Sequence, residues 1–156
     1  NKQLLSSIAI NPDTPIKSIF PFINTLDQVL IMSVQAGFSG QDFIPECIEK
    51  ARSLIQYRKD NNLTFEIAMD GGIDENNIKE LANIGVDAFA IGSGIFDTPN
   101  PLATLKKLNA LINSWPLSEK LYHSQRNSGD TIHACNFLER KLIIKQLKYQ
   151  EVLLMF

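Results

Sequence analysis

Four apolar runs of strand length recur in the first 113 residues, and each is followed by a segment with helical character. The runs are residues 4–10, 28–34, 65–73 and 86–91, and the expected helices are residues 14–20, 45–57, 76–83 and 101–112. Strands that alternate with helices in this way predict an α/β fold with a parallel sheet and helical crossovers. The pattern alone does not distinguish an open doubly wound sheet from part of a barrel.

Single residues set the expected ends of these elements. Thr14 can cap a helix whose first position is Pro15, and Pro21 ends that helix because it lacks the N–H that an interior position needs. Asp74 is the expected N-cap of the helix at 76–83, and Gly85 closes it. Each boundary therefore rests on local chemistry rather than on the hydrophobic pattern.

Composition narrows the class of protein. A chain of 156 residues with 44% hydrophobic residues can bury a core, and its length suggests one domain. A formal charge of -2 argues against a nucleic-acid binder, and no apolar run has the length of a membrane span or the form of a secretion signal. Cys47 and Cys135 are too few and too far apart for a disulfide framework or zinc motif. A cytoplasmic protein is expected.

Glycine is concentrated where the strands end. Seven of the eight glycines lie between Gly37 and Gly94, and the pairs Gly71 with Gly72 and Gly92 with Ser93 follow consecutive strands. Backbone N–H groups that glycine leaves accessible can bind an anion without lysine. Barrels of parallel strands often bind phosphate after strands seven and eight. Phosphate binding is the functional interpretation, and tight turns alone are the alternative.

Four motifs together resemble the second half of ribulose-phosphate 3-epimerase. They are IAINPDTPI at 8–16, VLIMSVQAGFSGQDF at 29–43, AMDGGI at 68–73 and AIGSGIF at 90–96, in the order and spacing of that family. The resemblance covers about residues 1–113. It implies the second half of a TIM-type (β/α)8 barrel that interconverts ribulose 5-phosphate and xylulose 5-phosphate with a divalent metal, whose identity (zinc, iron, manganese or cobalt) stays open. Relatives that act on hexulose phosphates such as allulose 6-phosphate remain an alternative.

The resemblance also implies roles for individual residues. Asp70 resembles an aspartate that is both a metal ligand and one of two acid/base groups, and Met32 resembles a methionine beside the reacting end of the sugar. The family usually has Pro-Gly-Phe-Gly-Gly where this chain has Ala-Gly-Phe-Ser-Gly at 36–40. The remaining residues resemble contacts to the sugar and its phosphate: Gly37, Phe38, Ser39, Gly40, Gly71, Gly72, Gly92 and Ser93.

The chemistry requires more than this chain offers. Epimerisation removes a proton from one face of a planar enediolate and returns one to the other face, so one carboxylate cannot do both. In the family, the second aspartate and the histidine ligands come from the first half of the barrel, and nothing here matches them. We therefore expect the chain alone to be inactive. Strands 4–10 and 86–91 are expected to have unpaired edges, which tend to pair, so the chain is expected to self-associate. Two copies could close a barrel, the tail helix could cover the open side, or a separate first half could complete the site. A non-catalytic phosphate-binding fragment is the competing hypothesis.

Residues 114–156 form a tail that matches no part of the family. It holds both histidines, His123 and His133. The pair His133 and Cys135 could be a fragment of a metal site, but a chance pairing in a polar segment is the favoured interpretation. Leucines at 138, 142, 147 and 154 predict an amphipathic helix over residues 138–156. The chain is thus divided into an epimerase-like half barrel at 1–113 and a helical or poorly ordered tail of unknown role at 114–156.

Overall fold

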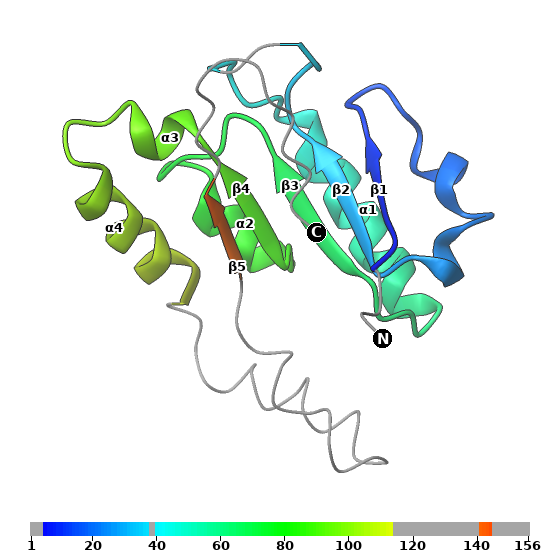
Figure 1. The fold of residues 1–156 in the computed structure, drawn as a ribbon. Helices are drawn as coiled ribbons and strands as arrows, with labels where there is room; N and C mark the ends of the chain where they lie inside the picture. The colour runs from blue at the N-terminus through cyan, green and yellow to red at the C-terminus, as the bar shows by residue number, and fades with distance from the viewer. Residues whose placement is uncertain (1–4, 38–39, 114–140, 145–156) are drawn as a thin grey trace.

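The fold is a parallel sheet with helices packed on one face (Figure 1). A computed structural model describes residues 5–37, 40–113 and 141–144. The strands are β1 (Ser7–Ile10), β2 (Gln28–Met32), β3 (Glu66–Asp70), β4 (Ala88–Ile91) and β5 (Lys141–Ile144). They lie in the order β1-β2-β3-β4-β5, and every neighbouring pair is parallel. Strand order therefore follows chain order, as in a barrel of this type.

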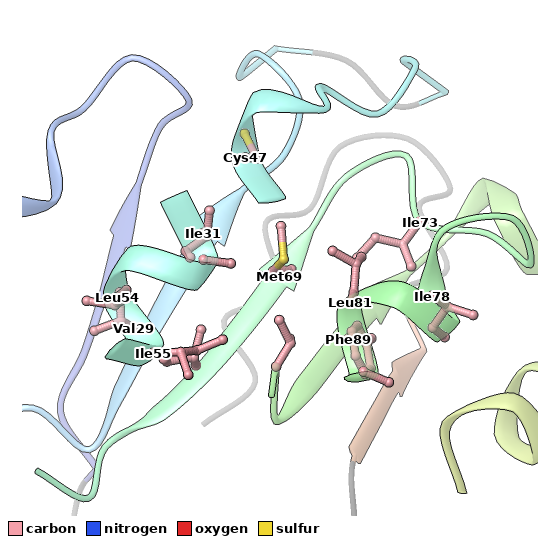
Figure 2. Packing of buried hydrophobic residues seen from close by; sticks show 14 of the residues in the cluster. Val29, Ile31, Cys47, Leu54, Ile55, Met69, Ile73, Ile78, Leu81 and Phe89 are labelled. Carbon is pink, nitrogen blue, oxygen red and sulfur yellow. The ribbon is translucent and has the colours of Figure 1, made fainter. Parts of the chain in front are cut away.

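The helices are α1 (Glu46–Asp60), α2 (Ile78–Ile84), the short α3 (Ser93–Phe96) and α4 (Pro101–Asn113). Alternation along the strands directs Val29, Ile31, Ile67, Met69, Phe89 and Ile91 to the helical side. Figure 2 shows several of these side chains beside Leu54 and Ile55 of α1 and Ile78 and Leu81 of α2. Burial of these apolar side chains, at about 1.5–3 kcal/mol for each large one, holds the helices on the sheet.

The segment after β1 differs from the expected helix at 14–20. It forms two 3-10 turns, η1 (Ile16–Ile19) and η2 (Ile23–Thr25), and no side chain caps the first of them. The Ser18 amide donates to the Pro15 carbonyl at 3.1 Å, which is the tighter i to i+3 pairing. Pro21 stands between the two turns and prevents a continuous α-helical ladder. The capping role expected of Thr14 is therefore wrong.

The fifth strand corrects two further expectations. β5 lies inside the amphipathic helix expected at 138–156, so that helix is wrong at 141–144, and the rest of the tail lies outside the described residues. β5 also pairs with β4, so the edge expected to be unpaired at 86–91 is covered. The other expected edge stands, because β1 pairs only with β2 in the part of the chain that the structure describes. No helix among these residues is long and apolar enough to cross a membrane.

Candidate functional site

The carboxyl ends of β2 and β3 bring the expected reacting residues together. Met32 and Asp70 are direct partners in the ladder between these strands, and Asp70 is in turn paired with Ala90 on β4. Residues in register on neighbouring strands point to the same face of the sheet. Met32 and Asp70 therefore share the face opposite the main helical core, and both are half-buried.

Ser33 fixes the end of β3 relative to β2. Its backbone amide donates to the Asp70 carbonyl at 2.8 Å, and its hydroxyl lies 2.7 Å from the Gly71 carbonyl and 3.1 Å from that of Asp70. The side chain is fully buried, and it is the only polar residue among the buried residues that the structure describes. Buried hydrogen bonds of this kind restrict the local backbone, so the position of Asp70 is set by its neighbouring strand.

The loop after Asp70 makes a turn that requires glycine. Gly72 has φ +61°, and a Cβ built on it would lie 2.4 Å from the Phe43 amide nitrogen. A side chain at this position would therefore be strained and would also collide with backbone. The Asn77 carboxamide donates to the Gly72 carbonyl at 2.8 Å, and its oxygen accepts from the Asp74 amide at 3.1 Å. The Asn77 side chain thus hydrogen-bonds to the loop at two points, the Gly72 carbonyl and the Asp74 amide.

Asp74 stands at the start of the turn that leads into α2, with the contacts of the expected N-cap. Its carbonyl accepts from the Ile78 amide at 3.0 Å, and its carboxylate accepts from the Asn76 amide at 2.8 Å and from the Asn76 side chain at 2.9 Å. Helix α2 itself begins later than expected, at Ile78, and Asn77 directly before it makes no side-chain cap to the helix. This local turn positions the polar side chains that follow the glycine loop.

A pocket of about 380 Å³ lies beside this loop. Three of the expected phosphate contacts line it, Gly40, Gly72 and Ser93, together with Gly94. The described lining contains no lysine or arginine but two carboxylates, Asp42 and Asp74. An anion in this pocket would depend on backbone N–H groups and on the amide side chains of the lining, Gln41, Asn76 and Asn77.

The other expected contacts are distributed around the pocket. Gly71 and Gly92 are chain neighbours of the lining residues Gly72 and Ser93. Gly37 belongs to the segment after β2. Two residues that flank it, Gln41 and Gln35, are joined by a hydrogen bond in which the Gln41 side chain donates to the Gln35 carbonyl at 2.7 Å. Phe38 and Ser39 lie outside the described residues. The structure thus places the expected residues in two adjacent groups. One is the pair Met32 and Asp70 at the strand ends, and the other is Gly40, Gly72 and Ser93 around the pocket.

Donors for a metal ion are sparse here. The described residues contain no group of three histidine, cysteine or acidic side chains that could hold a metal. Asp70 is the one expected ligand, and its ladder partner Met32 offers only a thioether, which is a poor ligand for hard divalent cations. These residues do not by themselves fit a divalent metal site.

Cys47 lies directly behind the site. Its thiol is 3.5 Å from the Met32 carbonyl and the residue is 1% exposed. Burial raises the pKa of this thiol, whereas the charge of Lys50 acts in the opposite direction. A neutral thiol is a weak nucleophile, so Cys47 is a packing residue in this position.

Sequence reasoning missed two residues of this region, Ser33 and Asn77. A serine directly after an apolar strand carries little signal, because its partners are carbonyls on another strand. Asn77 had a clearer signal, since it follows Asp74 by three residues and directly precedes an apolar helix.

Comparison with known proteins gives consistent matches over this region. The model described as the Ribulose-phosphate 3 epimerase family matches residues 2–96. A ribulose-phosphate 3-epimerase of Aquifex aeolicus is 41% identical over 109 residues, which are 70% of this chain and 49% of that protein. The Mycobacterium bovis protein of the same name is 35% identical over 66% of this chain and 45% of its own length. The Escherichia coli K12 protein of that name is 38% identical over 61% of this chain and 42% of its own length. The chain spans less than half the length of these relatives.

Proposed function

This chain belongs to the ribulose-phosphate 3-epimerase family, and from that membership we propose that it carries the phosphate-binding half of a pentulose-phosphate epimerase site. The substrates would be ribulose 5-phosphate and xylulose 5-phosphate, in carbohydrate metabolism. The observation that carries the proposal is the pairing of Met32 with Asp70 at the strand ends, next to the pocket lined by Gly40, Gly72 and Ser93.

Each group has a distinct proposed role. The pocket holds the substrate phosphate through backbone N–H groups, which fixes the sugar relative to the sheet. Asp70 removes the proton from the carbon next to the carbonyl, and Met32 provides an apolar contact to the reacting end. Gly37, Phe38, Ser39, Gly71 and Gly92 complete the sugar and phosphate contacts in this proposal.

A second group must act on the opposite face of the enediolate. Members of this family depend on a divalent metal. Asp70 is the ligand proposed for it here, and the described residues contain no group of three possible ligands. We propose that a separate first half supplies the second acid/base group and the remaining ligands. The chain alone then has one base and no way to invert the carbon.

Isotope exchange tests the role of Asp70. In deuterated water, a single base removes a proton and returns a deuteron on the same face, so the chain should label one epimer without forming the other. Asp70→Asn should abolish this labelling while the circular dichroism spectrum is unchanged. Labelling that persists in Asp70→Asn would contradict the role, and so would formation of the other epimer by the chain alone.

Amide shifts test the pocket separately. Titration with xylulose 5-phosphate should shift the amides of Gly72, Ser93 and Gly94 and leave that of Gly85, at the far end of α2, unchanged. Inorganic phosphate should move the same three amides more weakly, because it lacks the sugar. Uniform shifts, or none, would exclude phosphate binding here.

The covered β4 edge favours a second candidate, a phosphate-binding half barrel without catalysis. A first half would need that edge for barrel closure, and β5 occupies it. This candidate predicts the same amide shifts but no deuterium incorporation, so the two experiments together separate it from the epimerase half site.

A further inference from the structure

We propose that β5 shields the outer edge of β4 and so prevents two copies of this chain from closing into one barrel. β5 pairs with β4 in parallel over four residues, from Ala88 with Lys141 to Ile91 with Ile144. β4, α4 and β5 therefore repeat the strand, helix and parallel strand order of the preceding units (Figure 1). In a closed barrel the last strand pairs with the first, and β5 occupies that strand's position.

The opposite edge of the sheet is open in the described part of the chain. β1 pairs with β2 on one side only, and Ser7 and Ala9 are exposed. Leu5, just before this strand, is 69% exposed. A strand edge with unpaired N–H and C=O groups can pair with a strand of another molecule.

A second copy has the geometry to complete such a barrel. Strands β1 to β4 run in one direction, and together they are half of the eight strands of a closed barrel of this class. In a two-fold arrangement, β1 of each copy would lie beside β4 of the other, which leaves no edge unpaired. If only one of the two β1–β4 pairings formed, each copy would keep one unpaired strand edge.

The side chains at this seam are compatible with close approach. The ladders place Ala9 beside Leu30, Leu30 beside Ala68 and Ala68 beside Ala88, so Ala9 and Ala88 belong to the same face of the sheet. Both residues are small, and neither would obstruct a neighbouring strand. What prevents the pairing is that the N–H and C=O groups on the outer side of β4 already bond to β5.

Two substitutions in β5 test the proposal in the full chain. Leu142→Pro with Ile143→Pro removes two consecutive backbone donors, one of which must point toward β4 because successive N–H groups alternate in direction. Leu142→Val with Ile143→Val keeps both donors and a strand-forming side chain, and it is the matched control. Light scattering after size exclusion gives the mass of each.

The wild type and the valine variant should have the 17.5 kDa mass of one chain, and the proline variant twice that mass. The amides of Ala88 to Ile91 should be protected from hydrogen exchange in all three proteins. In the wild type and the valine variant β5 protects them, and in the proline variant the second copy does.

A monomeric proline variant whose β4 amides exchange faster would overturn the proposal, because its β4 edge would be free and yet not pair with a second copy. Larger open assemblies would contradict two-fold closure, and a dimeric valine variant or wild type would show that β5 is no barrier. These masses do not depend on phosphate binding or proton transfer, so failure here is distinct from failure of the proposed function.

Discussion

Replacing Gly72 by alanine should damage both the fold and the pocket. Gly72 has φ +61°, where an L-residue is disfavoured by about 1–2 kcal/mol. The new Cβ would also lie 2.4 Å from the amide nitrogen and 2.6 Å from the Cα of Phe43. These atoms are backbone and cannot turn aside, so the loop or the segment at Phe43 must move, at a further cost of about 1–3 kcal/mol. The expected loss is about 2–5 kcal/mol.

Gly85→Ala is the matched control. Gly85 also has a positive φ, +111°, but a Cβ there would meet only the Ile55 side chain at 3.6 Å, an ordinary contact. This variant should lose only the conformational part, about 1–2 kcal/mol. The difference between the two variants therefore measures the collision with Phe43.

Urea unfolding followed by circular dichroism gives both free energies, provided that the denaturant slope is unchanged. Gly72→Ala should also weaken the amide shifts caused by xylulose 5-phosphate, whereas Gly85→Ala should not. Equal free energies of unfolding for the two variants would refute the reasoning, because they would mean that the Gly72 loop relaxes without cost.

Two further predictions concern buried side chains behind the site. Ser33→Ala should lower the free energy of unfolding by about 1–3 kcal/mol, because it leaves the Gly71 carbonyl without its buried donor, and urea unfolding checks this. In a Cys135→Ser background, the Cys47 thiol should react with a disulfide reagent only as fast as the protein opens, since it is buried and its pKa is raised by that burial. Rapid labelling of the native protein at neutral pH would contradict this.

Sequence reasoning was most successful where the determinants are local. All four expected strands are present, because short apolar runs that end in turn-forming residues such as glycine, asparagine and proline carry a strong local signal. Their observed ends are shorter, as in β3, which spans Glu66–Asp70 within the expected 65–73. Helices α1 and α4 agree closely with the expected 45–57 and 101–112. The family assignment is confirmed by the family model that matches residues 2–96 and by the relatives of 35–41% identity.

The failures occur where distant residues decide the structure. The helix expected at 14–20 forms only a 3-10 turn at Ile16–Ile19, although Pro21 does end it as expected. The loop between β1 and the first 3-10 turn is held by a distant residue, Lys50 of α1. Its ammonium group donates to the carbonyls of Asn11 and Thr14, each at 2.8 Å, and to that of Pro12. Leucine spacing at 138–156 predicts a helix, whereas residues 141–144 pair with the open edge of β4. An available sheet edge can override helical spacing.

Two contacts that shape the pocket lined by Gly40, Gly72 and Ser93 are made within the described part of this chain. Ser33 on one side and Asn77 on the other fix the loop that follows Asp70, and both belong to the described chain. Because these contacts belong to the chain itself, we expect the proposed phosphate binding to persist in the chain alone. Proton transfer differs, because a single carboxylate reaches one face of the enediolate whatever its precise position. Binding and catalysis should thus separate in this molecule, with the fold of the half barrel sufficient for the first and a second acid/base group required for the other.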